Sequence, residues 1–494
     1  MTVYLVGAGP GDPGLLTVRA RELISAADVV VHDRLVDARV LGDAREGSLL
    51  VDVGKRAGGD AAAAQQEINE LLVEHGLGGA LVVRLKGGDP YVLGRGGEEA
   101  LALEAAGVAY DVVPGVSALA AVPAYAGVPL TLRGVSSSVV VVTGHDPDGE
   151  PGTPVDWDAV GRSGATVVVM MGVARRAEIA ASLMRAGRPG TTPVLVVERG
   201  TTPMQHSART TLEELGGLEV ESPATIVVGD VARLRLATFE QRRLFGRCVV
   251  VTRPRRQAGP LVRALWAEGA SAVELPTIEI AEAHDGGRAL AGAAARLGAF
   301  DWVVFSSENG VERLFAEVRD ARGFGSALVA AIGPGTAAAL AAHGVVADLV
   351  PERFVAEGLL EVFPSRDAPP GAGSGKVLLA RAATARDVLP RGLEQLGWQV
   401  EVVEAYRAVR PEAPPKLLEA VASADAVTFT SSSTVTGFLE MAGRDRLPPV
   451  VASIGPVTSA TARAAGLVVT VEAREHTVDG LVEALAAHAA AQRP

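Results

Sequence analysis

Short runs of Val, Ile and Leu recur along the whole chain and alternate with segments of helical spacing rich in Ala, Leu, Arg and Glu. The clearest apolar runs are 3–6, 29–31, 82–85, 139–142, 167–171, 194–197, 249–251, 303–305, 377–379 and 427–429. Continuous apolar strands are typical of sheets covered by helices on both faces. The pattern therefore predicts an α/β fold with mainly parallel sheets.

A chain of 494 residues is too long for a single hydrophobic core. A boundary is expected near 238–246, where a polar segment at 240–243 follows the apolar run 226–231 and the run 249–251 restarts like a first strand. We expect one domain at 1–242, with lobes of about 1–115 and 134–238, and a second at 243–494.

The second domain contains a weak internal repeat. Phe305-Ser306-Ser307 is echoed by Phe429-Thr430-Ser431, and 332–336 is echoed by 454–458. The repeat predicts two related α/β lobes with a ligand cleft between them. The alternative is that strand-turn-helix units resemble one another in any α/β protein.

Charge and composition exclude several classes of protein. The net charge is -12 and no long basic run occurs, which argues against a general nucleic-acid binder. One cysteine, Cys248, excludes an internal disulfide and a cysteine-based zinc site, and the histidines lack metal-binding spacing, so no metal is expected. The start of the chain lacks a basic leader and no apolar stretch suggests a membrane span, so we expect a cytoplasmic protein.

The first strand runs into Gly7-Ala8-Gly9-Pro10-Gly11-Asp12-Pro13-Gly14. This loop is not a dinucleotide fingerprint, because Asp12 stands where the third glycine belongs and would repel a phosphate. Two prolines also remove amide donors. The loop suits close approach of the backbone to a flat or zwitterionic ligand.

An ordered set of motifs in residues 1–238 resembles the uroporphyrin-III C-methyltransferase family. The matched segments are 6–17, 33–36, 53–58, 66–69, 83–90, 94–99, 113–118 and 142–145. The resemblance implies a fold of two α/β lobes that bind S-adenosylmethionine between them. Cobalt-precorrin methyltransferases share only part of the set.

The resemblance also assigns roles to individual residues. Asp33 is the candidate proton acceptor and Lys55 the candidate proton donor. The cofactor-binding residues would be Pro10, Gly87, Gly88, Asp89, Val92, Ser117, Ala118, Met171 and Gly200. Simpler interpretations remain open: a surface carboxylate capping a turn for Asp33, and core filling for Met171.

The implied substrate is rich in carboxylates, which basic side chains would bind on an acidic protein. Arg34, Arg56 and Arg133 are the candidates, and Arg84 and Lys86 are expected to share their local basic surface. The chain departs from the usual family pattern at His32, Asp60, Leu132 and Met170, which we expect to alter how the porphyrinogen is held.

Residues 246–490 resemble uroporphyrinogen-III synthase through softer signals, at 251–254, 275–278, 301–311, 331–336, 403–407 and 453–458. The resemblance implies cyclisation of hydroxymethylbilane without a cofactor. It also implies one lobe of about 246–276 plus 407–490 and one of about 280–403, with chain crossings between them at 275–281 and 402–409. Tyr406 would assist the leaving hydroxyl, and Ser307, Thr336, Ser431 and Thr458 would hold substrate carboxylates. Ordinary helix capping and packing are equally good interpretations of these residues.

Together the two resemblances predict a bifunctional enzyme, a methyltransferase and a lyase. It would convert hydroxymethylbilane to uroporphyrinogen III and methylate that product at C2 and C7 to precorrin-2, a precursor of siroheme and cobalamin. Homodimerisation through the methyltransferase half is implied, with no nucleic-acid or membrane partner. Alternatives are a precorrin methyltransferase of the cobalamin pathway, a non-catalytic tetrapyrrole-binding second half, and a two-lobed solute-binding protein.

Overall fold

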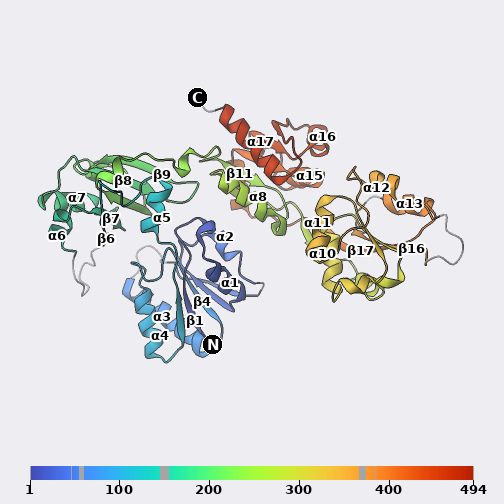
Figure 1. The fold of residues 1–494 in the computed structure, drawn as a ribbon, viewed down its shortest axis with the longest axis horizontal. Coiled ribbons are helices and arrows are strands. Elements are labelled where there is room, and N and C mark those ends of the chain that lie inside the picture. Colours follow the sequence, from blue (N-terminus) through green and yellow to red (C-terminus); the bar gives the residue numbers. More distant parts are fainter. Residues whose placement is uncertain are drawn as a thin grey trace. The chain divides into compact units, whose positions relative to one another are not determined.

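The computed structural model describes residues 2–45, 47–54, 61–144, 155–366, 374–383, 385 and 387–492. They form two compact units, one of Met1–Val249 with 263–272 and 485–494, and one of Val250–Val262 with 273–484. Each unit is drawn in Figure 1. No helix in these ranges is long and apolar enough to cross a membrane. The division between 242 and 243, and the lobe limits given above, stay predictions.

The first sheet is wholly parallel and has the order β3-β2-β4-β1-β5. Its strands are β1 (Val3–Gly7), β2 (Val29–His32), β3 (Leu49–Asp52), β4 (Val82–Lys86) and β5 (Tyr110–Val113). Val30 and Val83 pack toward α1 (Val18–Ala26), whereas Val29 and Val82 pack toward α3 (Ala61–Leu77) and α4 (Gly96–Ala105). Figure 1 shows these helices on opposite faces of the sheet.

The second sheet has the order β6-β7-β10-β8-β9. Its strands are β6 (Val139–Thr143), β7 (Thr166–Met170), β8 (Pro193–Glu198), β9 (His206–Thr211) and β10 (Ala224–Val228). Only β6 and β7 pair in parallel. The expectation of mainly parallel pairing is wrong here, because β8 returns directly as β9 and no α-helix separates β9 from β10.

Helices also cover this second sheet. α5 (Ala118–Tyr125) connects the two sheets of the first unit, and its Val122 packs against Leu195 and Val197 of β8. On the opposite face, α6 (Trp157–Arg162) and α7 (Arg176–Arg185) contribute to a second core with Val167 and Val169. The loops that leave β1, β4, β7 and β8 therefore extend from buried, rigid strands.

The second half contains two more sheets, with the orders β12-β11-β18-β19-β20 and β13-β17-β16-β14-β15. The first contains β11 (Cys248–Val251), β12 (Ser271–Glu274), β18 (Ala426–Phe429), β19 (Val450–Ser453) and β20 (Val471–Glu472). The second contains β13 (Glu279–Ala281), β14 (Trp302–Phe305), β15 (Leu328–Ala331), β16 (Lys376–Ala382) and β17 (Gln399–Val409). Pairing is parallel in both, apart from β13 with β17, among the pairs described.

Strand pairing and threonine hydrogen bonds hold the segments predicted to cross between the lobes. β13 and the end of β17 pair antiparallel, with Glu279 opposite Val409 and Ala281 opposite Arg407. Buried threonines then bond across neighbouring segments: Thr252 Oγ1 donates to Thr428 O at 2.7 Å, and Thr277 Oγ1 donates to Thr252 O at 3.1 Å. Their hydroxyls are satisfied inside the core, so these polar residues do not interrupt it.

Candidate functional site

Backbone packing builds a glycine-lined cradle where β1, β4 and β5 end. The amide of Gly9 donates to Gly88 O at 3.2 Å, and the amide of Gly88 donates to Gly9 O at 2.7 Å. A Cβ added to Gly7 would lie 2.5 Å from Gly115 Cα and 2.6 Å from Gly88 O. Parallel α/β sheets bind ligands at this carboxyl edge, and only glycine permits backbone approach this close.

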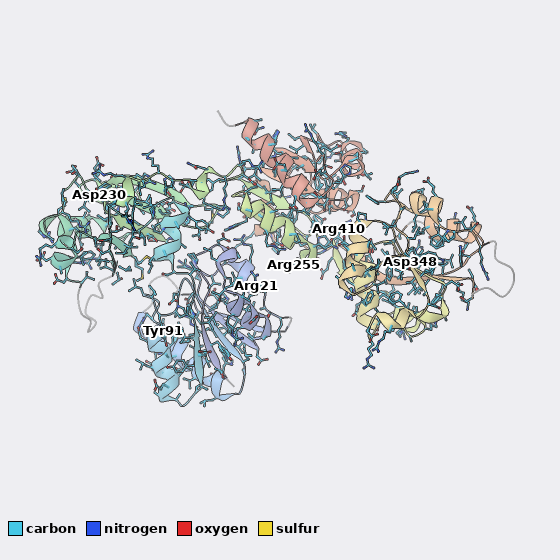
Figure 2. The ribbon with its side chains drawn as sticks, viewed as in Figure 1. Arg21, Tyr91, Asp230, Arg255, Asp348 and Arg410 are labelled. Carbon is cyan, nitrogen blue, oxygen red and sulfur yellow. The ribbon has the colours of Figure 1, made fainter. Side chains whose placement is uncertain are left out.

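Asp89 braces the loop that follows β4. Its Oδ1 accepts from the amide of Tyr91 at 2.9 Å, and its Oδ2 accepts from the amide of Gly115 at 3.0 Å. The predicted cofactor residue therefore also joins two sides of the cradle. Beyond it, Tyr91 and Val92 expose apolar side chains, and Figure 2 labels Tyr91. Gly87 is exposed and Pro10 is partly exposed.

Strained backbone occurs in the loops after three strands of the first unit. Among the described residues, the non-glycine residues with positive φ are Leu93 (54°), Arg95 (59°), Met171 (55°), Arg199 (45°) and Thr201 (68°). They follow β4, β7 and β8, and such strain is characteristic of ligand sites. The Met171 residue is 52% exposed, so core filling is the wrong interpretation of it. Sequence reasoning had no signal for the strain, which depends on tertiary packing.

Asp12 ties the glycine loop to the second sheet's loops. The Tyr125 hydroxyl donates to Asp12 Oδ2 at 2.7 Å, and the Asp12 amide donates to Thr201 Oγ1 at 3.2 Å. Burial and the bond to Asp12 raise the pKa of Tyr125. Gly200, beside Thr201, is buried so tightly against Val122 that a Cβ would clash. The site therefore needs both lobes of the first unit to keep its shape.

Ser117 and Ala118 stand at the start of α5, next to Gly88. The Ser117 hydroxyl is the N-cap of the helix and accepts from the amide of Leu119 at 3.4 Å. Both residues are partly buried. Capping by Ser117 is thus observed, and contact with a cofactor stays a prediction for both residues.

Asp33 lies directly after β2 and its carboxylate is 34% exposed. Its Oδ1 accepts a hydrogen bond from Arg84 Nη2 at 2.6 Å. The carboxylate is therefore held by a charged partner. The simpler interpretation, in which it caps a turn, does not describe this contact. A charge-assisted bond of this length fixes the orientation of the carboxylate while one side stays open to solvent.

Arg84 and Lys86 do not belong to a basic surface, contrary to the sequence-based expectation. Both are buried, at 1% and 3% exposure, and both pair with the fully buried Glu99 of α4. Arg84 Nε lies 3.0 Å and Lys86 Nζ 2.7 Å from Glu99 Oε1. The error arose because β4 is a central strand whose two faces are covered. Burial, assisted by Arg84 and opposed by Glu99, lowers the pKa of Lys86.

Of the other residues predicted to bind substrate, some are described by the structure and some are not. Arg34 and Arg133 are exposed, as carboxylate ligands must be. Lys55 and Arg56 lie outside the described residues, as does Asp60. Of the other departures, His32 Nδ1 lies 3.3 Å from Asp33 O, and Met170 Sδ accepts from Thr225 Oγ1 at 3.9 Å.

In the second unit, Tyr406 of β17 meets Ser307 at the start of α10 (Glu308–Glu317). The two hydroxyl oxygens are 3.0 Å apart, and the Gly310 amide donates to Ser307 Oγ at 3.1 Å. Tyr406 is otherwise packed in the core. Capping by Ser307 and packing by Tyr406 are therefore observed, and their hydroxyls also form a polar pair.

The other predicted carboxylate ligands differ among themselves. Ser431 caps α15 (Ser432–Met441), accepting from the Thr434 amide at 3.3 Å. Thr336 and Thr458 are not caps, because Gly333 and Gly455 occupy the N-cap positions of α11 (Pro334–Ala342) and α16 (Pro456–Ala464). Both threonines are buried. Capping is thus the wrong interpretation of these two.

The second unit contains a cavity of about 900 Å³, which is lined by Glu308 and Asn309 but not by Ser307 or Tyr406. Lining residues come from α10, from the start of α8 (Arg255–Ala267) and from the segment after β17. Arg255, labelled in Figure 2, is one of the lining residues. Its charged lining residues are Arg255, Glu279, Glu308, Glu312, Arg313, His343 and Glu412. Carboxylates dominate this lining, so a carboxylate-rich ligand would need backbone amides at the helix starts as its donors.

Comparison with known proteins finds two families in the chain. The family described as Tetrapyrrole (Corrin/Porphyrin) Methylases matches residues 2–216, and the family described as Uroporphyrinogen-III synthase HemD matches residues 259–483. The chain is 34% identical over 501 residues to "Porphyrin biosynthesis protein HemD" of Ruminiclostridium josui, covering 98% of this chain and 97% of that protein.

The first half has further relatives. It is 46% identical over 244 residues to the "S-adenosyl-L-methionine-dependent uroporphyrinogen III methyltransferase" of Methanosarcina barkeri, covering 49% of this chain and 95% of that protein. A solved structure of the uroporphyrin-III C-methyl transferase of Thermus thermophilus, complexed with S-adenyl homocysteine, is 47% identical. Its TM-score is 0.42, with 47% of this chain and 99% of that chain covered.

The sheets, the glycine cradle and the family matches define a tetrapyrrole methylase joined to a second α/β enzyme module. The chain belongs to the porphyrin-biosynthesis family represented by the full-length relative. It carries a methyltransferase domain and a uroporphyrinogen-III synthase domain, and its role lies in tetrapyrrole synthesis.

Proposed function

We propose that this chain performs two consecutive reactions. The second half closes hydroxymethylbilane to uroporphyrinogen III, and the first half methylates that product at C2 and C7 to give precorrin-2. The observation that carries the proposal is the presence of both family matches, side by side, in a chain aligned with 97% of a porphyrin-biosynthesis relative. The product of one half is the substrate of the other.

The cradle in the first unit fits S-adenosylmethionine. At its floor the backbone is packed so closely that a Cβ at Gly7 would clash with Gly115 and Gly88. Met171, after β7, is exposed and has a positive φ. The residues proposed to hold the cofactor are Pro10, Gly87, Gly88, Asp89, Val92, Ser117, Ala118, Met171 and Gly200. When bound, the cofactor supplies a methyl group already activated on a sulfonium, so orientation provides much of the rate.

For the methyl transfer, Asp33 accepts the proton that the pyrrole ring must lose. Arg84 orients the Asp33 carboxylate, and the exposed side of that carboxylate faces solvent where substrate can reach it. Lys55 is proposed as the proton donor. Arg34, Arg56 and Arg133 are proposed to bind substrate carboxylates, because guanidinium groups pair with them in bidentate fashion.

For the cyclisation, Tyr406 assists departure of the hydroxyl group of the bilane. Its hydrogen-bonded partner Ser307 orients the phenol. Ser307 and Ser431 are proposed to bind substrate carboxylates together with amides at the starts of their helices. For Thr336 and Thr458 the proposal is restricted to the amides around them, because their side chains are buried.

The finer cellular assignments are proposals as well. We propose a cytoplasmic protein that forms a homodimer through its methyltransferase half and does not bind nucleic acid.

Each activity is tested with its own substrate. The purified chain, given uroporphyrinogen III and S-adenosylmethionine without oxygen, should yield a product heavier by two methyl groups. Given hydroxymethylbilane alone, it should yield the type III isomer. Unmethylated product in the first reaction contradicts the methyltransferase, and only the spontaneous type I isomer in the second contradicts the synthase. Asp33→Asn should stop only the first reaction, and Tyr406→Phe should slow only the second.

A further inference from the structure

Four ionisable side chains form a continuous buried group beneath the cradle. Asp33 pairs with Arg84, Arg84 pairs with Glu99, and Glu99 pairs with Lys86. Only the Asp33 end is open to solvent, since the other three side chains are almost completely buried. Lys86 also ends β4, directly before the cofactor loop, and its carbonyl accepts from the Ala8 amide at 2.7 Å. The group therefore links the proposed proton acceptor to the cradle floor.

Stability alone is a poor explanation of this arrangement. Buried ion pairs are often no more stabilising than apolar side chains of the same volume. The two carboxylate oxygens of Glu99 differ in their hydrogen bonds. Oε1 accepts from Arg84, Lys86 and Gln65, whereas Oε2 has no partner among the described residues. An unsatisfied buried carboxylate oxygen costs folding free energy. Such a cost is expected where the charge itself has a use.

We propose that Glu99 is a positioning residue for methyl transfer, which holds Arg84 against Asp33, and that Lys86 supplies the charge that balances it. The inference rests on the proposed role of Asp33 as proton acceptor. The group contains two acidic and two basic side chains, so their formal charges cancel. Glu99 and Asp33 share one guanidinium, Glu99 through Nε and Asp33 through Nη2 of Arg84. Because Glu99 takes part of that positive charge, Asp33 is oriented by Arg84 but remains able to accept a proton.

Opposite charge changes should then have opposite effects. Glu99→Gln removes the charge that competes for Arg84, so Asp33 becomes a weaker proton acceptor. The acid limb of the pH profile of methyl transfer should move to lower pH by about one unit, and the maximal rate should fall about threefold or more. Lys86→Met leaves the group with an excess negative charge, and the same limb should move to higher pH by about one unit.

The other charged or titratable groups near Asp33 stay the same in these variants. On its own and the adjoining strand, these are His32, Arg34 and Asp52. The doubly substituted chain, Glu99→Gln with Lys86→Met, restores the original net charge. Its acid limb should return toward that of the parent, because the two charge changes have opposite signs. Glu104→Gln is the matched control, because it makes the same change at an exposed position of the same helix.

The experiment measures single-turnover methylation of uroporphyrinogen III from pH 5 upward, for the parent and each variant, with S-adenosylhomocysteine affinity as the test of an intact cradle. Opposite limb shifts in the single variants, reversed in the double variant, are the expected result. The inference is overturned if the acid limbs of both single variants coincide with that of the parent or move in the same direction. It is also overturned if the parent shows no acid limb. A purely structural Glu99 would weaken cofactor affinity without moving the limb. If Asp33→Asn methylates at the parent rate, the proposed role of Asp33 fails instead.

Discussion

The hydroxyl of Tyr125 donates a hydrogen bond of 2.7 Å to Oδ2 of Asp12. Tyr125 ends α5, whereas Asp12 belongs to the glycine loop after β1, so the bond joins segments far apart in the sequence. Asp12 is itself buried and also accepts from the Gly14 amide at 2.7 Å. The Asp12 carboxylate thus connects the glycine loop to the end of α5.

Tyr125→Phe should therefore weaken the attachment of the glycine loop without leaving a cavity, because the ring is kept. We expect the free energy of unfolding to fall by about 1 kcal/mol, the usual contribution of one such bond. S-adenosylhomocysteine should bind several-fold more weakly, as measured by calorimetry. An unchanged affinity would show that the cradle keeps its shape without this bond.

The same residue predicts a dependence of stability on alkaline pH. Burial, and then the bond to Asp12, raise the pKa of Tyr125 above its ordinary value of 10.0. The folded state thus keeps a proton that the unfolded state releases above that pH, so this contribution is complete below pH 10 and is lost as the pH rises further. Thermal unfolding between pH 9 and 11 should show a smaller alkaline loss for Tyr125→Phe than for the parent. Equal losses would contradict the assignment.

Gly7→Ala tests the backbone floor of the cradle. The added methyl group would meet Gly115 Cα and Gly88 O at 2.5 and 2.6 Å, neither of which can move without opening the sheet edge. We expect S-adenosylhomocysteine affinity to fall by at least about tenfold, with a loss of stability of about 1–3 kcal/mol from overpacking. Gly97→Ala is the control, because nothing lies within 4 Å of its added Cβ and alanine favours a helix. Equal effects of the two substitutions would contradict the close-packing argument.

Tyr406→Phe and Ser307→Ala address the second half. Each removes one oxygen of a pair 3.0 Å apart. Cyclisation of hydroxymethylbilane should slow in both variants, and more in Tyr406→Phe, while methylation of supplied uroporphyrinogen III stays at the parent rate. A parent rate of type III isomer from Tyr406→Phe would show that this tyrosine only fills the core.

The α/β fold was predictable because buried parallel strands appear in the sequence as uninterrupted apolar runs. β9 was missed because its residues 206–211 include His206, Arg209 and several hydroxyl side chains, which suit a half-exposed strand at a sheet edge. The antiparallel pairing of β10 could not be read either, since direction depends on the connections rather than on composition.

The candidate site was only partly predictable. Glycine motifs located the cradle, because close backbone packing leaves a direct trace in the sequence. Arg84 and Lys86 were misplaced because a charged residue beside a motif normally indicates a surface. Their burial depends on Glu99, thirteen to fifteen residues away, and such a pairing is visible only when the helix is folded onto the sheet.

The central claim is that one chain carries both consecutive reactions. The most direct test gives the purified chain hydroxymethylbilane without oxygen, with and without S-adenosylmethionine, and separates the products by isomer and mass. We predict uroporphyrinogen III without the cofactor and its dimethylated form with it. Type I isomer in both reactions would contradict the account of the second half, and type III isomer that stays unmethylated would contradict the account of the first.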